Sequence, residues 1–100
     1  MKARILPIAL RDIGSIYDWL SVRSADAADR VEASIFKTIE LLERHPGSGE
    51  ETDRRNVHRW PMTQYPYTIF YRVRRINNFI EILRVIHGRR VRNLRRVPRR

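Results

Sequence analysis

Residues 65–90, YPYTIFYRVRRINNFIEILRVIHGRR, decide the fold of this 100-residue chain. From Tyr67 to Arg74, aromatic and β-branched residues alternate with others at a period of two, which is the pattern of a β-strand. Asn77 and Asn78 form a turn dipeptide, because asparagine tolerates positive φ angles. The run from Phe79 to His87 is apolar on both faces, as is typical of a central strand. The stretch predicts a β-hairpin followed by an arginine-rich exit.

The chain before this hairpin predicts two amphipathic helices and two further strands. Residues 9–22 place their apolar side chains on one helical face, and the segment from the N-cap Ser24 to Arg44 does the same. Pro46 and Gly47 stop the second helix. Residues 3–8 and 57–62 predict short strands, and Pro7 limits the first of them to an edge or a strand end. Residues 48–56 predict a polar loop.

The order β-α-α-β-β-β predicts an α+β fold, with an N-terminal helical hairpin packed on one face of a small antiparallel β-sheet. Residues 1–92 are expected to form a single domain. Residues 93–100, with the sequence NLRRVPRR, are too charged to build a core. We expect this basic tail to be mobile until it meets a partner.

Composition excludes several classes of protein. The chain contains no cysteine, hence no disulfide framework and no thiolate metal site, and its three histidines lack metal-ligand spacing. No apolar run approaches the ~18 residues of a membrane span. The sequence therefore predicts a cytoplasmic protein without a cofactor, a metal ion or a membrane partner.

The charge of the chain is divided unevenly between its halves. Residues 1–53 hold seven basic and ten acidic residues, whereas residues 54–100 hold fourteen basic residues and one acidic residue, Glu81. Nineteen of the 21 basic residues are arginine, whose planar fork suits phosphate and carboxylate groups. This asymmetry favours a polyanionic partner such as nucleic acid, the ribosome or an acidic protein. A compositional bias toward arginine is the alternative.

Basic side chains gather on the predicted sheet and form the best candidate for a target-binding surface. The candidates lie on or just beyond its strands: Arg59, Arg72, Arg74, Arg84, His87, Arg89 and Arg90. One interpretation is a docking face without chemistry. The other is a catalytic cluster, in which a neutral His87 acts as a base and the arginines stabilise a phosphorane-like charge.

The chain resembles the RelE/ParE superfamily of bacterial type II toxin–antitoxin systems over residues 3–92. The resemblance rests on two helices, the Pro46-Gly47 stop, and two later segments, YPYTIFYRV and EILRVIHGRR. Its most specific pieces are residues 65–67 (YPY), 70–73 (FYRV) and 85–90 (VIHGRR). The resemblance implies the α+β fold described above.

The superfamily implies two activities on one fold. ParE-like members inhibit DNA gyrase by protein–protein contact, whereas RelE-like members cut mRNA in the ribosomal A site. The nuclease pattern is incomplete here, since no lysine follows Lys37 and no tyrosine follows Tyr71. Arg72 and His87 match catalytic positions of nuclease-type members, and with Arg89 they would form that site. The matching pieces favour a ParE-like toxin; the alternatives are a ribosome-dependent mRNA endonuclease and a non-toxic basic nucleic-acid-binding domain.

Both branches imply a cognate antitoxin, whose disordered C-terminal segment wraps the toxin and folds on binding. Such segments are often acidic, which complements the basic half of the chain. Trp19 lies about 110° from the centre of its helix's apolar stripe, and Phe36 also flanks its own stripe. These two aromatic residues, with Arg89 and Arg90, are the candidate antitoxin contacts. Ordinary half-buried packing is the alternative for Trp19 and Phe36.

Overall fold

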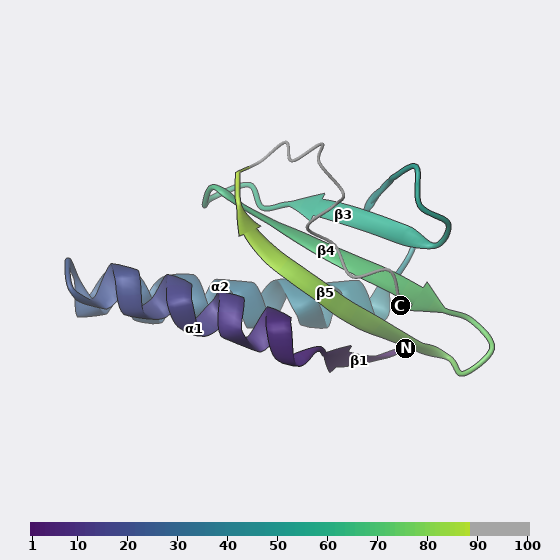
Figure 1. Cartoon of the computed structure of the whole chain (residues 1–100), viewed down its shortest axis with the longest axis horizontal. Helices are drawn as coiled ribbons and strands as arrows, with labels where there is room; N and C mark the ends of the chain where they lie inside the picture. Colours follow the sequence, from purple (N-terminus) through teal and green to yellow (C-terminus); the bar gives the residue numbers. More distant parts are fainter. Residues whose placement is uncertain (89–100) are drawn as a thin grey trace.

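Two helices cover one face of a five-stranded sheet in the computed structural model (Figure 1). The structure describes residues 1–88, so Arg89, Arg90 and the predicted tail at 93–100 lie outside the described residues. The α+β fold class is confirmed. In chain order the elements are β1 (Lys2–Ile5), α1 (Pro7–Ser21), α2 (Ala25–Arg44), β2 (Glu50–Glu51), β3 (Val57–Pro61), β4 (Tyr67–Arg74) and β5 (Phe79–His87).

The sheet has the strand order β1-β5-β4-β3-β2, and it is mixed rather than fully antiparallel. The predicted hairpin forms between β4 and β5, and β5 is an interior strand as expected. Strand β1 pairs with β5 in parallel, which corrects the expected antiparallel sheet. A parallel pair needs a long connection between its strands, and here the helices and β2 to β4 supply it.

Two local expectations differ from the structure. The predicted strand at residues 3–8 ends at Ile5, and α1 begins at Pro7 rather than at Ala9. Proline suits the first helical position, because its φ is already helical and its missing N–H would have no partner there. The predicted polar loop at 48–56 contains the two-residue strand β2, paired through Glu50 with Arg59. A strand of two residues is too short to show the alternation of side chains by which a strand is predicted from sequence.

The helices meet the sheet over one continuous core. Ser24 caps α2 as predicted, its Oγ accepting a hydrogen bond from the Ala27 N–H at 3.1 Å. None of the helices in the described part of the chain is long and apolar enough to cross a membrane. The buried residues of this core are Ala9, Ile13, Val31, Ile35, Ile39, Leu42, Met62, Tyr67, Ile69, Tyr71, Val73, Ile80, Ile82 and Val85.

The opposite face of the sheet carries a second, smaller apolar cluster of Val57, Phe70, Leu83 and Ile86. A register shift between β4 and β5 makes this cluster possible, because Phe70 pairs with Arg84 whereas Tyr71 pairs with Ile82. Leu83 is the extra residue of this bulge, so the core beneath the helices receives Ile80 and Ile82 before it and Val85 after it, and Leu83 and Ile86 belong to the other cluster. Apolar residues on both faces of β5 follow from that geometry.

The carboxylate of Asp12 fixes α1 against the edge of β5. Strand β1 covers that edge only as far as Ile82, so the backbone of Val85 lies beyond it. Asp12 Oδ2 accepts hydrogen bonds from Val85 N at 3.0 Å and from Arg84 Nε at 2.7 Å. Its Oδ1 accepts a third from Arg84 Nη2 at 2.9 Å. One side chain therefore closes an open strand edge and binds an arginine fork in two places.

A second contact, through Tyr71, joins the end of α2 to the sheet. Its hydroxyl donates to the carbonyl of Pro46 at 2.8 Å and accepts from the Gly49 N–H at 2.9 Å. Burial raises the pKa of Tyr71. A Cβ atom on Gly49 would lie 2.6 Å from the Tyr71 hydroxyl, whereas one on Gly47 would meet no atom within 4 Å. The approach of Tyr71 therefore requires glycine at position 49 but not at position 47.

Replacing Asp12 by asparagine is expected to lower the free energy of unfolding by about 2–3 kcal/mol, since charge-assisted hydrogen bonds are lost from a partly buried site. Urea denaturation measures the change. Asp18→Asn, on the exposed side of the same helix, is the control, and its effect is expected to stay within about 0.5 kcal/mol. Equal losses in the two variants would contradict the role given to Asp12.

Gly49→Ala is expected to lower the free energy of unfolding by about 1–3 kcal/mol, because the added methyl group displaces the Tyr71 hydroxyl. Gly47→Ala, two residues away in the same loop, is the matched control and should change stability by less than about 0.5 kcal/mol. Thermal or urea denaturation of the two variants compares them directly. A Gly49→Ala variant as stable as Gly47→Ala would show that Tyr71 moves away at no cost.

Candidate functional site

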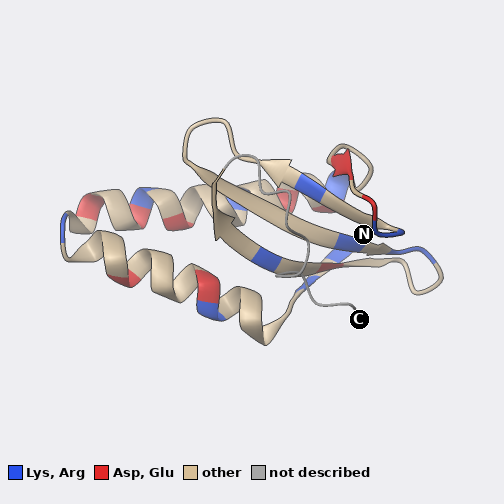
Figure 2. Cartoon of the chain, turned by 45° about the horizontal axis from the view of Figure 1, so that its top comes forward, with Lys and Arg blue, Asp and Glu red and all other residues tan. Residues whose placement is uncertain are grey.

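The arginines of the sheet lie beside carboxylates rather than on a bare basic face. Lysine and arginine occur on the strands and turns, and most of the acidic residues lie on the helices and β2 (Figure 2). Arg59 Nε lies 2.7 Å from Glu50 Oε1, and Arg74 Nε lies 2.8 Å from Glu81 Oε1. Arg84 is held by Asp12, which raises the pKa of this arginine. Arg84 therefore has a structural role in joining α1 to β5.

Arg72 is buried in the sheet, with only 6% of the residue exposed. Its Nη1 lies 3.6 Å from Glu81 Oε1. Burial is the largest cause that lowers the pKa of Arg72, and the neighbouring charge of Arg74 lowers it further, whereas Glu81 raises it. Arg72 is therefore a buried side chain rather than an exposed one in this structure, and its role in target binding stays a prediction.

His87 is exposed at the end of β5 and lies in a different environment. Its ring meets the ring of Tyr67 edge-on, with 5.5 Å between the centroids. The two residues are paired across β4 and β5. Burial raises the pKa of Tyr67, whose ring belongs to the core beneath the helices.

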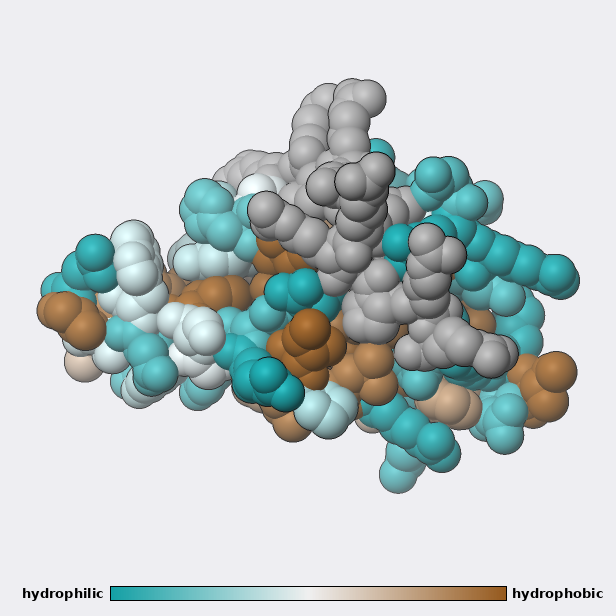
Figure 3. Space-filling view, in the orientation of Figure 1, coloured by the Kyte–Doolittle hydropathy of each residue, from teal (hydrophilic) through white to brown (hydrophobic). Residues whose placement is uncertain are grey.

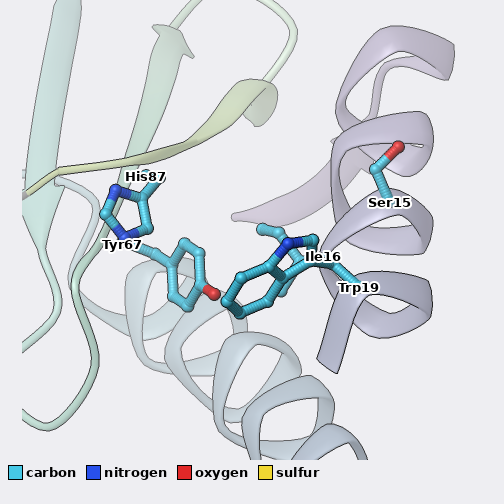
Figure 4. A pocket seen from close by; sticks show the side chains of 5 residues that line it. All are labelled: Ser15, Ile16, Trp19, Tyr67 and His87. Carbon is cyan, nitrogen blue, oxygen red and sulfur yellow. The ribbon is translucent and has the colours of Figure 1, made fainter. Parts of the chain in front are cut away.

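A cavity of about 310 Å³ opens between α1 and the paired ends of β4 and β5. In Figure 4 the Tyr67 ring lies between the imidazole of His87 and the indole of Trp19. We call this space the Trp19 cavity; its lining residues are Ser15, Ile16, Trp19, Tyr67 and His87. Trp19 is 58% exposed, as the helical pattern predicted, and the guanidinium of Arg23 lies 3.7 Å from its ring centroid.

The sequence indicated Trp19 and His87 as two separate candidates and did not predict that they share a cavity. It gave no indication that Ile16 and Tyr67 belong to the same site. The spacing of Asp12, Ile16 and Trp19 by four and then three residues places these side chains along one side of α1. Since Asp12 contacts Val85, Trp19 lies two turns farther along, near the end of β5. Predicting this site would have required the contact between Asp12 and Val85 of β5, which joins residues 73 positions apart and leaves no local pattern in the sequence.

Phe36 lies in a second groove, between α2 and the edge strand β1. Its residue is 39% exposed, and the groove has a volume of about 500 Å³. The edge of β1 is partly closed, because Glu43 Oε2 accepts a hydrogen bond from the Ala3 N–H at 2.7 Å. Trp19 and Phe36 therefore line two different hollows rather than one.

The structure does not bring Arg72 and His87 together. Arg72 pairs with Glu81 in the register, whereas His87 pairs with Tyr67, five residues along β4. At ~3.3 Å per residue the two positions are about 17 Å apart along the sheet, and strand alternation turns their side chains to opposite faces. A general base and a charge-stabilising arginine must both reach the reacting group, so this pair does not form one catalytic centre.

The described residues also contain no group of three or more histidine and acidic side chains that is able to hold a metal ion. The Trp19 cavity combines an apolar wall, a partly exposed indole and an imidazole. These features suit an apolar side chain of a protein partner.

The chain is similar to a toxin family in sequence and to a solved structure in fold. A family model described as the ParE toxin of the type II toxin–antitoxin system parDE matches residues 3–92. A putative toxin, Y4kP of Sinorhizobium fredii (strain NBRC 101917 / NGR234), is 32% identical over 80 residues, which are 80% of each chain.

The fold is shared with a solved structure from the chromosomal ParDE toxin–antitoxin system of P. aeruginosa. The TM-score is 0.77 at 22% sequence identity, over 88% of this chain and 96% of that chain. The two chains thus share the overall fold. Because the family model spans nearly the whole described structure, the chain belongs to the ParE toxin family of type II toxin–antitoxin systems.

Proposed function

We propose that this protein inhibits DNA gyrase by protein–protein contact and is neutralised by a cognate antitoxin. The observation that carries the proposal, beside membership of the ParE family, is the placement of Arg72. Arg72 is buried beside Glu81 and lies far from His87 along the sheet, so the nuclease set expected for a RelE-like member is not assembled among residues 1–88. Binding, rather than cleavage of RNA, fits the exposed surfaces.

The antitoxin segment is proposed to contact both aromatic residues that stand out from the helices. Trp19 and Phe36 line separate hollows, one beside α1 and one beside α2, so one extended segment that wraps the toxin can fill both in turn. Buried aromatic anchors commonly contribute most of the binding free energy in such interfaces. An acidic segment would also be attracted by the net charge of +10.

Neutralisation follows if antitoxin and gyrase need the same end of the molecule. His87, a candidate for target binding, lines the Trp19 cavity together with Trp19 itself. An antitoxin segment seated on the indole would cover the imidazole at the same time. Gyrase and antitoxin would then exclude each other by occupying one surface, without any change in the fold of the toxin.

Purified full-length toxin is expected to inhibit plasmid supercoiling by DNA gyrase at micromolar concentration, and prior addition of the antitoxin should restore it. The assay is run at about 150 mM salt with excess linear DNA, because a basic protein also coats DNA and this coating weakens with salt. Relaxation of the same plasmid by topoisomerase I is the control reaction. Inhibition of both enzymes would indicate coating of DNA instead of contact with gyrase.

Normal supercoiling would reject the gyrase proposal and direct the test to translating ribosomes. There, mRNA cleavage that falls by about 100-fold or more in His87→Gln would identify a nuclease that uses this histidine as a base. Absence of both activities, together with salt-sensitive binding of bare duplex and no growth arrest on expression, would identify a non-toxic nucleic-acid-binding domain.

Trp19→Ala is expected to weaken antitoxin binding by at least thirtyfold, on the order of 2 kcal/mol, as for other buried aromatic anchors. Phe36→Ala should weaken binding as well. Val22→Ala is the control, since Val22 is 85% exposed and lines neither hollow. Calorimetric titration of each toxin variant with the purified cognate antitoxin measures the three affinities. Equal affinities for all three variants and the wild type would place the interface elsewhere.

A further inference from the structure

A third hollow lies where the turn between β2 and β3 meets the end of β4. Its volume is about 280 Å³, and we call it the turn cavity. The end of the molecule that holds these turns has a largely hydrophilic surface (Figure 3). The polar side chains that line the cavity come from both segments: Glu51, Thr52, Arg54, Arg55, Asn56, His58 and Arg75.

The turn that presents the two neighbouring arginines is held in a defined shape. Thr52 Oγ1 donates to the Val57 carbonyl at 2.9 Å and accepts from the Arg54 N–H at 3.2 Å. Asn56 adopts a left-handed conformation, with φ of 63°, and its carbonyl accepts a hydrogen bond from Val73 N at 2.9 Å. That last bond ties the turn to β4, the strand that leads to Arg75. A ligand would therefore meet arginines on a largely preformed frame.

Positive charge in the turn cavity is in excess. Three arginines, Arg54, Arg55 and Arg75, line it against one carboxylate, that of Glu51. Arg55 and Arg75 are both exposed and make no ion pair with another described residue. The Nδ1 atom of His58 is buried and has no hydrogen-bond partner in the described part of the chain.

Further positive charge lies behind the cavity. Burial lowers the pKa of Arg72, and the charges of Arg74 and Arg54 lower it further, whereas the single carboxylate of Glu81 raises it. The positive charges of Arg54 and Arg74 thus act on Arg72 at this end of the sheet, where like charges repel one another. A bound anion would relieve that repulsion, so the surroundings favour an anionic ligand at this position.

We propose that the turn cavity binds a phosphate group. A tetrahedral phosphate accepts hydrogen bonds from several directions, which suits arginines that approach from two separate turns. A carboxylate is planar and is satisfied by a single arginine fork, so it matches two arginines from separate turns less well than a tetrahedral group does. The phosphate belongs either to a nucleic-acid backbone or to a free small molecule. The site lies away from the Trp19 cavity and does not depend on gyrase as the target.

The test compares the full-length protein with Arg55→Gln/Arg75→Gln and with a control of equal charge change, Arg11→Gln/Arg30→Gln on the exposed faces of the helices. Fluorescence anisotropy measures the Kd for a labelled 12-base-pair DNA duplex between about 50 and 200 mM salt. Melting temperature with and without inorganic phosphate tests the free anion. A third variant, Arg55→Lys/Arg75→Lys, keeps the charge and removes the forks.

We expect the cavity variant to bind duplex at least tenfold more weakly than the control variant, with a salt slope that is smaller by about one, as for one lost phosphate contact. The lysine variant should fall between them, and it carries the test if the glutamine variant does not fold. Selective loss of duplex binding assigns a nucleic-acid phosphate. Stabilisation by inorganic phosphate that only the cavity variant lacks, with duplex binding unchanged, assigns a free phosphate.

The proposal is overturned if the cavity and control variants respond equally to duplex and to inorganic phosphate, because the binding would then reflect net charge alone. It is also overturned if a short polyglutamate peptide shows the same loss of affinity in the cavity variant as the duplex does. That result would make the cavity a carboxylate site.

Discussion

The structure depends on how α1 is held against the uncovered end of β5. Strand β1 pairs with β5 only to Ile82, since Pro7 turns the chain into a helix. The remaining strand edge would expose backbone groups that need partners. Asp12 meets that need at Val85, whose backbone N–H donates to its carboxylate, and two hydrogen bonds from the Arg84 side chain hold the carboxylate there. Because α1 is fixed at this point, Trp19 comes to lie beside Tyr67 and His87, and the Trp19 cavity exists.

This arrangement changes the meaning of the basic half of the chain. A net charge of +13 over residues 54–100 suggests a bare cationic sheet, yet Arg59, Arg74 and Arg84 each lie within 3 Å of a carboxylate oxygen. Partly buried arginines of this kind hold the fold together, and removing one partner leaves an uncompensated charge. Among the described residues of this basic half, 54–88, the exposed arginines without an ion pair lie in the turns, at Arg55 and Arg75, rather than on the strands.

The sequence predicts well what is local and poorly what is distant. Alternation predicted β4, the Asn77-Asn78 dipeptide predicted its turn, where Asn78 has φ of 57°, and Ser24 predicted its cap. The parallel pairing of β1 was not predictable, since its register joins Ala3 to Ile80 across most of the chain. The burial of Arg72 was hidden for the same reason. Alternation with a period of two shows which side chains share a face of the strand, but it does not show which residues cover that face.

The Trp19 cavity and the turn cavity lie at opposite ends of β4, and they differ in chemistry. Tyr67, at one end, lines the apolar Trp19 cavity; Arg75, just past the other end, lines the polar turn cavity. Apolar burial is insensitive to salt, whereas contacts between arginine and phosphate weaken steeply as salt rises. A partner that engages both would thus bind with a salt-independent part and a salt-dependent part. The rigid strand pair between them fixes their separation, so such a partner must span the length of β4, and a partner confined to one end leaves the other free.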